Sequence, residues 1–134
     1  MPSRNSKFQI EDSRLTKPNP VQEKSYAFAL RIVKLYRHLS EERKEFVLSK
    51  QILRSGTSVG ANVEEAIGGQ SEKDFTAKMS IAYKETRETH YWLRLLRDSL
   101  ILDNQQADSM LSDCEELLKL CGSIIKTMRS KEKR

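Results

Sequence analysis

The sequence predicts an all-α protein, an up-down antiparallel four-helix bundle, and three observations favour this fold class. Apolar residues recur every three or four positions through most of the chain, which is the helical period. Capping residues and a Gly-Gly pair divide this pattern into long segments with short connections, which are typical of antiparallel neighbours. No β-rich segment interrupts the pattern.

The composition places the chain among globular proteins. Its 134 residues allow one domain with a sizeable core, and 37% hydrophobic with 32% charged residues excludes disordered and collagen-like classes. No apolar run approaches the roughly 20 residues of a membrane span, and the N-terminus lacks the apolar stretch of a signal peptide. We therefore expect a cytoplasmic protein with no membrane partner.

The two cysteines, Cys114 and Cys121, cannot provide a disulfide framework. Seven residues apart on one helix, they would lie about 10 Å from each other. This separation is beyond disulfide reach. We expect both to be small, reduced core residues.

The first helix is predicted over residues 19–39. Asn19 supplies an N-cap, Pro20 follows at the first helical position, and Gln22 completes a capping-box pattern. The apolar face of this helix consists of Phe28, Ile32, Leu35 and Leu39.

The second helix is predicted over residues 40–67. Ser40 is its expected N-cap, and the two acids that follow would lie in the positive first turn. Gly68 and Gly69 end this helix, because glycine is the residue best suited to a left-handed terminus.

The third and fourth helices are predicted over residues 71–102 and 103–128. Ser71 restarts the chain after the glycines, and Asp103 with Gln106 opens the last helix. Apolar residues of the fourth helix alternate steps of three and four, which is a heptad seam: Ala107, Met110, Cys114, Leu117, Cys121, Ile124 and Met128. A second apolar stripe beside the seam fits either a wider core or a subunit interface.

The two ends of the chain fall outside the predicted helices. Residues 1–18 have no sustained apolar period, so we expect a flexible N-terminal arm. Residues 129–134 are expected to form a frayed basic tail. The predicted bundle therefore covers residues 19–128.

A polar stripe runs along the second helix at the edge of its apolar face. Its members fall within a sector roughly 100° wide, and they are Gln51, Arg54, Ser55, Ser58, Asn62 and Glu65. Gly56 and Gly60 lie in the same helix, where each costs about 1 kcal/mol relative to alanine. We expect close approach of another backbone to offset this cost, the alternative being two incidental weak points.

The third helix carries a matching set at helical spacing, namely Glu85, Glu88, Thr89 and Trp92. We predict an ion pair of Arg54 with Glu85 or Glu88, because a buried charge without a partner costs several kcal/mol. Such a pair would fix helix register or the assembly of subunits. Two alternatives stay open, a ligand site between the helices and a solvated polar face.

No pattern of residues points to catalysis. Di-iron bundles use Glu-x-x-His motifs with further glutamates, whereas His90 lies about 200° round the helix from Glu88. The serines lack a glycine elbow, and neither a phosphate loop nor a dinucleotide fingerprint occurs. We expect no catalytic residue, no metal and no cofactor, and an enzyme with a small-molecule site is the least favoured class.

The formal net charge is +5, and the basic excess lies within residues 1–39. Candidate residues for contact with nucleic acid on the first helix are Lys24, Arg31, Lys34 and Arg37. The alternative is a solvated helix face. In a ring-shaped oligomer such a patch repeats once per subunit, and its phosphate contacts add.

One block of the sequence is more specific than its periodicity. It comprises Gln51, Arg54, Ser55, Ser58, Asn62 and Glu65, followed by Phe75, Ala82, Glu85, Glu88, Thr89, Trp92 and Leu93. This block resembles the bacterial four-helix-bundle proteins encoded by intervening sequences within 23S ribosomal RNA genes, and the similarity extends over roughly Pro20 to Met128. The resemblance implies a homo-oligomer, a pentameric ring, and no enzymatic activity. A more distant similarity is to the accessory protein of diversity-generating retroelements, a basic pentameric bundle that engages reverse transcriptase and nucleic acid.

Together these observations favour a non-enzymatic oligomeric bundle that associates with ribosomal or other RNA, or with a ribonucleoprotein. In this interpretation the polar stripe holds the assembly and the first helix contacts phosphates. Two alternatives stay open. One is an adaptor or scaffold that binds proteins but no nucleic acid, and the other is a retroelement accessory protein that engages a reverse transcriptase.

Overall fold

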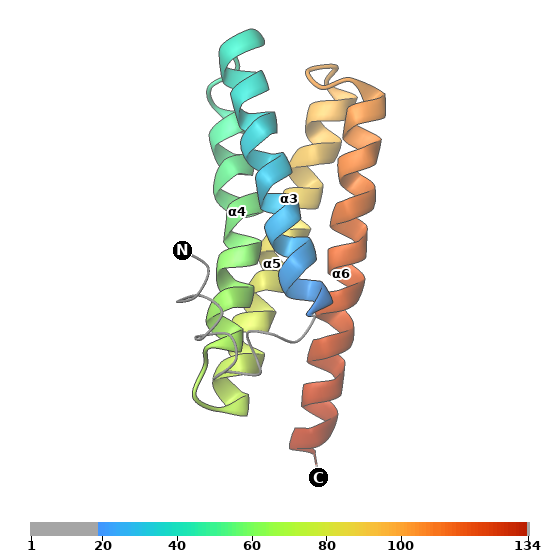
Figure 1. The fold of residues 1–134 in the computed structure, drawn as a ribbon. Coiled ribbons are helices and arrows are strands. Elements are labelled where there is room, and N and C mark those ends of the chain that lie inside the picture. The colour runs from blue at the N-terminus through green and yellow to red at the C-terminus, as the bar shows by residue number, and fades with distance from the viewer. Residues whose placement is uncertain (1–18, 134) are drawn as a thin grey trace.

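The computed structural model describes residues 19–133, so the arm predicted at 1–18 lies outside the described residues. Within this range the chain forms four α-helices and no strand: α3 (Pro20–Arg37), α4 (Leu48–Ile67), α5 (Glu72–Asp98) and α6 (Asn104–Glu132). A π-helical turn, η1 (His38–Glu42), follows α3 directly. Figure 1 shows the four helices lying side by side. The predicted all-α class with four helices is thus confirmed.

Three of the predicted N-caps are present. Each joins a side-chain oxygen to the backbone N–H three residues later: Asn19 with Gln22 (3.1 Å), Ser71 with Asp74 (3.0 Å) and Asp103 with Gln106 (3.1 Å). The capping box at Asn19 is only half formed, because the Gln22 amide donates instead to the carboxylate of Glu64 on α4. The start of α3 is thereby tied to the end of α4.

The second helix begins at Leu48, and the prediction of an N-cap at Ser40 is wrong. The Ser40 hydroxyl donates to the carbonyl oxygen of Tyr36 (2.8 Å) within the π-helical turn. Glu45 takes the capping role, because its carboxylate accepts the backbone N–H groups of Val47, Leu48 and Ser49 at 3.2, 3.0 and 2.7 Å. One carboxylate thus satisfies three of the donors that the start of a helix leaves without partners.

The helix α4 ends before Gly68 as predicted, but without a left-handed residue. Gly68 has φ −82°, and no described glycine has a positive φ. The left-handed residues are Lys44 (φ 56°) and Leu100 (φ 65°), in the connections before α4 and before α6. This conformation costs a residue with a side chain roughly 1–2 kcal/mol, and it lets the chain reverse within a few residues.

The ends of the last two helices also differ from the prediction. The helix α5 ends at Asp98 rather than at 102, because the chain turns at Leu100 and buries Leu102 in the core. The helix α6 continues through Glu132, so most of the tail predicted at 129–134 is helical. No glycine or proline interrupts this segment, and basic residues in a last turn favour a helix C-terminus.

One hydrophobic core fills the space between the helices. The helix α4 packs against α3 and α5, and α6 packs against α5 and α3. The predicted apolar face of the first helix is buried throughout, at Phe28, Ile32, Leu35 and Leu39. The seam of α6 is buried from Ala107 to Cys121, whereas Ile124 and Met128 are partly buried. Among the described helices, none combines the length and apolar character that crossing a membrane requires.

The two glycines in the middle of α4 lie where α3 comes closest. A Cβ atom on Gly60 would lie 3.3 Å from the carbonyl oxygen of Ser25, so the predicted approach of another backbone is present there. A Cβ atom on Gly56 would lie 2.6–2.9 Å from three side-chain atoms of Ile32. The helical propensity lost at both positions therefore allows α3 and α4 to pack closely.

The two cysteines should be unreactive in the folded protein. Both are free and buried, and burial raises the pKa of the Cys114 thiol to about 12 and that of Cys121 to about 11. Because the thiolate is the reactive form, a thiol reagent at neutral pH should modify them only as fast as the protein opens. Labelling followed by mass spectrometry along a urea series measures this. Fast modification without denaturant would contradict it, and Cys114→Ser with Cys121→Ser is the control for labelling elsewhere.

Candidate functional site

The seam between α4 and α5 holds the predicted ion pair. Arg54 on α4 contacts two carboxylates of α5, with its Nη1 2.8 Å from Glu85 Oε2 and its Nη2 hydrogen-bonded to Glu88. Both contacts lie within one chain. The Glu85 side chain is only 11% exposed, whereas Arg54 is 52% exposed. The guanidinium therefore covers a nearly buried carboxylate with its charged end in reach of solvent.

Trp92 extends this cluster along α5. Its indole N–H donates to the same Glu88 oxygen that Arg54 contacts, at 2.9 Å. This hydrogen bond, followed by the one from Arg54, lowers the pKa of Glu88. The hydrogen bonds from Arg54 to Glu88 and Glu85 raise the pKa of its guanidinium in turn. These contacts join α4 to α5 through hydrogen bonds that involve charged groups.

A buried hydroxyl pair lies on the core side of the same seam. Thr89 Oγ1 is 2.8 Å from Ser55 Oγ and 2.8 Å from the carbonyl oxygen of Glu85. Both side chains are fully buried. Because buried hydroxyls are costly without partners, this contact adds a second polar link between α4 and α5.

The structure brings together six of the ten residues predicted for register or assembly, and four lie apart. The six are Arg54, Ser55, Glu85, Glu88, Thr89 and Trp92. Asn62 donates to the Ser58 carbonyl and hydroxyl within α4, at 2.9 and 3.0 Å. Gln51 is exposed, and Glu65 pairs with Lys78 at 2.9 Å on the surface. The stripe is therefore not one continuous ladder across the seam.

The stability contributed by Glu88 should be lost in acid. Because its pKa is lowered in the folded state, this contribution is present at neutral pH and disappears as the pH falls through the folded pKa. Trp92 is the only tryptophan, so its fluorescence reports the contact directly. We expect an acid transition in this fluorescence that Glu88→Gln removes. A transition of the same size in Glu88→Gln would contradict the assignment, and Glu65→Gln on the surface is the matched control.

The basic residues predicted on the first helix fall into two groups. Lys24 pairs with Glu116 at 3.2 Å, and Arg31 pairs with Asp113 at 2.6 Å. Lys34 and Arg37 are exposed and make no ion pair within residues 19–133. A recess of about 280 Å³ separates this part of α3 from α6, and it is lined by Arg31, Lys34, Leu35, His38, Gln106 and Met110.

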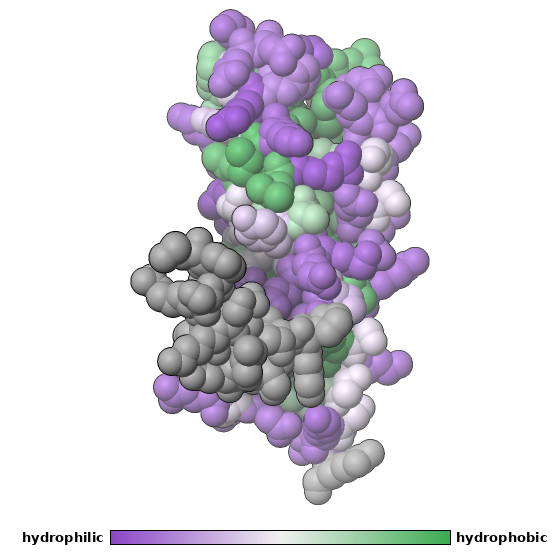
Figure 2. All heavy atoms as spheres, viewed as in Figure 1, coloured by the Kyte–Doolittle hydropathy of each residue, from purple (hydrophilic) through white to green (hydrophobic). Residues whose placement is uncertain are grey.

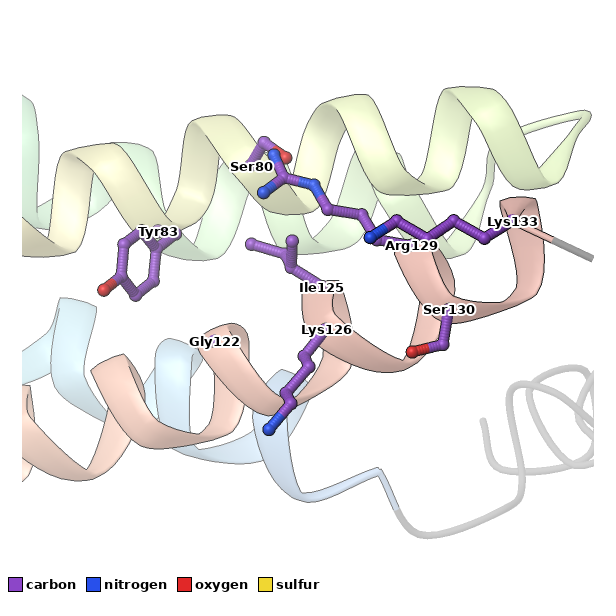
Figure 3. Close-up of a pocket in the computed structure, with 8 residues that line it drawn as sticks. All are labelled: Ser80, Tyr83, Gly122, Ile125, Lys126, Arg129, Ser130 and Lys133. Carbon is purple, nitrogen blue, oxygen red and sulfur yellow. The ribbon is translucent and has the colours of Figure 1, made fainter.

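A larger groove, which sequence reasoning missed, lies between the start of α5 and the end of α6 (Figure 3). Its volume is about 600 Å³, and its lining consists of Ser80, Tyr83, Gly122, Ile125, Lys126, Arg129, Ser130 and Lys133. The signal that could have found it is the spacing of three cations at positions 126, 129 and 133, which share one helix face. Because the sequence pattern predicts a helix end at 128, it does not place residues 129 and 133 on the same helix face as 126.

The ion pairs elsewhere on the described surface join only two or three side chains. Within the described part of the chain, no three His, Cys, Asp or Glu side chains gather as metal ligands would. His90 contacts Glu115 at 3.0 Å, and Arg97 contacts Asp98 and Asp108 at 2.9 and 3.0 Å.

Comparison with known proteins places the chain in a family. The model of the 23S rRNA-intervening sequence protein family matches residues 17–123. None of the curated proteins matches the chain. A crystal structure of a protein with unknown function from the S23 ribosomal protein family of Bacteroides thetaiotaomicron is 54% identical, has a TM-score of 0.79, and matches over 81% of this chain and 96% of that chain. The resemblance drawn from the sequence is thus confirmed, and this chain belongs to the 23S rRNA-intervening sequence protein family.

Proposed function

We propose that this chain is a non-catalytic four-helix protein that assembles with copies of itself and associates with RNA or a ribonucleoprotein through basic surfaces. The observation that carries the RNA part is the recess between α3 and α6. Arg31, Lys34 and His38 line it, no carboxylate does, and exposed Arg37 lies one turn of helix from Lys34. Phosphate groups bind readily where several donors face one opening. Arg31 and His38 each contact an acid, Asp113 and Glu42, so Lys34 and Arg37 are the cations that remain for phosphate.

The assembly that we propose is a pentameric ring of up-down bundles. Its support is the outward face of α5, where Ile81, Tyr91 and Leu95 are 41, 49 and 36% exposed. These side chains share one helix face next to the Arg54 cluster. A second copy of the chain is the proposed occupant of this face. Phosphate-binding patches would then repeat around the ring, and their contacts would add.

The RNA part is tested by fluorescence anisotropy with 23S ribosomal RNA fragments and duplex DNA across a salt series. We expect binding that weakens steeply with salt and that falls in Lys34→Glu with Arg37→Glu. Arg31→Glu is less suitable, because it also breaks the contact with Asp113. Lys44→Glu with Lys50→Glu, at exposed positions elsewhere, is the matched control. Absence of binding at low salt would overturn the proposal.

The assembly part is tested by light scattering. Tyr91→Lys with Leu95→Lys should reduce the particle to the 15.5 kDa of one chain, since charges in an apolar interface have no partners. Leu30→Lys is the control, because Leu30 is 51% exposed on α3. A wild-type protein of monomer mass would overturn the proposed assembly.

A protein-binding adaptor is the second candidate, and the surface of α3 favours it. Tyr26 and Leu30 are 63 and 51% exposed, and Figure 2 shows an apolar patch over this helix on an otherwise mainly hydrophilic face. A groove between α3 and α4 is lined by Tyr26 together with the small residues Ala29, Gly60 and Ala61, and by Thr57 and Glu64. If the wild-type protein binds no RNA in the test above and yet forms a stable oligomer, this candidate is favoured.

A further inference from the structure

The groove between α5 and α6 combines a set of cations with an apolar floor. Figure 3 shows Arg129 and Lys133 extending on the α5 side of the groove, while Lys126 projects on the opposite side. Ser80, Tyr83 and Ser130 add three hydroxyl groups to the lining. The chain therefore surrounds a volume of about 600 Å³ with donors from two helices.

The charge of this groove is not balanced by neighbouring acids. No carboxylate lines it, and its three cations make no ion pair within the described residues. Lys131, on the same helical turns, does pair with Glu72, at 3.8 Å. Farther along the same two helices, Arg97 is paired with Asp108. Other cations of the same two helices, such as Lys84 and Lys119, also make no ion pair within the described residues. The groove differs from them in that three such cations line one recess that no carboxylate lines.

Favourable interaction with the helix dipole explains only part of this charge. Cations in the last turn stabilise a helix C-terminus, and this accounts for Arg129 and Lys131. Lys126 lies about two turns before the helix end, outside the range of that effect. A ligand that carries negative charge accounts for the whole set.

The floor of the groove fits a flat apolar group. Gly122 lies against the edge of the Tyr83 ring, because a Cβ atom there would be in ordinary contact with Cε1 of the ring, at 3.5 Å. Ile125 supplies a second apolar wall. Proteins that bind single strands place an aromatic side chain beside a cationic groove, so that a base stacks while the backbone contacts cations. In a duplex the bases are stacked on each other and cannot enter such a groove.

We propose that the α5–α6 groove binds a nucleotide unit of single-stranded RNA, with its phosphates at Lys126, Arg129 and Lys133 and its base against Tyr83 and Ile125. This inference rests on the proposed function in that RNA is the ligand, and it names a site separate from the α3 surface. Because only an unstacked base can enter this groove, the protein should prefer single-stranded RNA to a duplex.

The test compares the same RNA oligonucleotide as a single strand and as a duplex in anisotropy titrations with the full chain. Lys126→Gln with Arg129→Gln and Lys133→Gln removes the cations, and we expect single-strand affinity to fall about ten-fold or more and the salt slope to fall by about 2. Gly122→Leu fills the groove at unchanged charge and should give a similar loss. Lys44→Gln with Lys50→Gln and Lys73→Gln is the charge-matched control, and circular dichroism checks the folding of each variant.

The outcomes separate this inference from the proposed function. If both groove variants bind the single strand like the wild type while Lys34→Glu with Arg37→Glu does not, the groove is wrong and the α3 surface stands. If the wild type binds no RNA, both fail. Adenosine monophosphate and inorganic phosphate are titrated as competitors. If the mononucleotide binds the groove as tightly as the strand, the groove takes free nucleotides and the single-strand assignment is overturned.

Discussion

Replacing Gly56 by alanine should destabilise the fold by about 2 kcal/mol, although alanine is the better helix former. The new methyl group would lie under 3 Å from three atoms of Ile32, which is fully buried and cannot move aside. Overpacking of this kind costs about 1–3 kcal/mol, and a clash with three atoms belongs at the upper end of that range. The gain in helix propensity offsets about 1 kcal/mol of this cost, which leaves a net loss of about 2 kcal/mol. Urea denaturation followed by circular dichroism measures the change in unfolding free energy.

A double-mutant cycle distinguishes this clash from a general weakness of α4. Ile32→Ala removes all three atoms that the methyl group would meet, so the double variant should be more stable than the sum of the two single changes predicts. Gly122→Ala is the matched control, because its Cβ atom would make only an ordinary contact at 3.5 Å. That control should be neutral or slightly stabilising. Additive effects of Gly56→Ala and Ile32→Ala would refute the packing argument.

Replacing Arg54 by methionine should cost about 2 kcal/mol. The change leaves the Glu85 carboxylate, only 11% exposed, without its ion-pair partner and close to Glu88. Breaking a fully buried pair costs about 3–5 kcal/mol, and the half-exposed position of Arg54 reduces this value. The stability of Arg54→Lys should lie between those of the wild type and Arg54→Met, because one ammonium group cannot contact both carboxylates as the guanidinium does.

The control for Arg54 removes the carboxylate as well. Arg54→Met with Glu85→Gln should recover much of the loss, since the unpaired charge is the main cause of it. Arg87→Met changes an exposed arginine of α5 and should have an effect within about 0.5 kcal/mol. Equal losses for Arg54→Met and Arg87→Met would show that the cluster does not stabilise the fold.

Local signals in the sequence predict most of this fold. Three helix starts carry a capping residue that hydrogen-bonds three positions ahead, and the pattern is visible in the sequence. The start of α4 could not be predicted in this way, because Ser40 and Glu45 both offer an oxygen near a helix start. Glu45 is the residue that caps, because the π-helical turn and the left-handed Lys44 delay the start of α4 to Leu48. Neither the π-helical turn nor the Lys44 conformation has a local sequence signal.

The candidate sites differ in how far the sequence reveals them. The Arg54 cluster could be predicted, since helical spacing places its members on facing edges of two helices and an unpaired charge is costly there. Gln51 and Glu65 share the same spacing, yet they are exposed, because a stripe about 100° wide cannot lie entirely within one seam. The α5–α6 groove depends on where α6 ends, and sequence patterns locate helix ends least reliably.

The unequal lengths of the helices imply a gradient of local stability. The helix α3 has 18 residues and α6 has 29, and Figure 1 shows the C-terminal end of α6 running beyond the start of α3. Backbone amides in those last turns are covered on fewer sides, so they should exchange with deuterium through local fraying, while amides beside Cys114 exchange only on global opening. A ligand held at that end raises the free energy of local opening there, and binding would appear as slowed exchange in the last turns of α6.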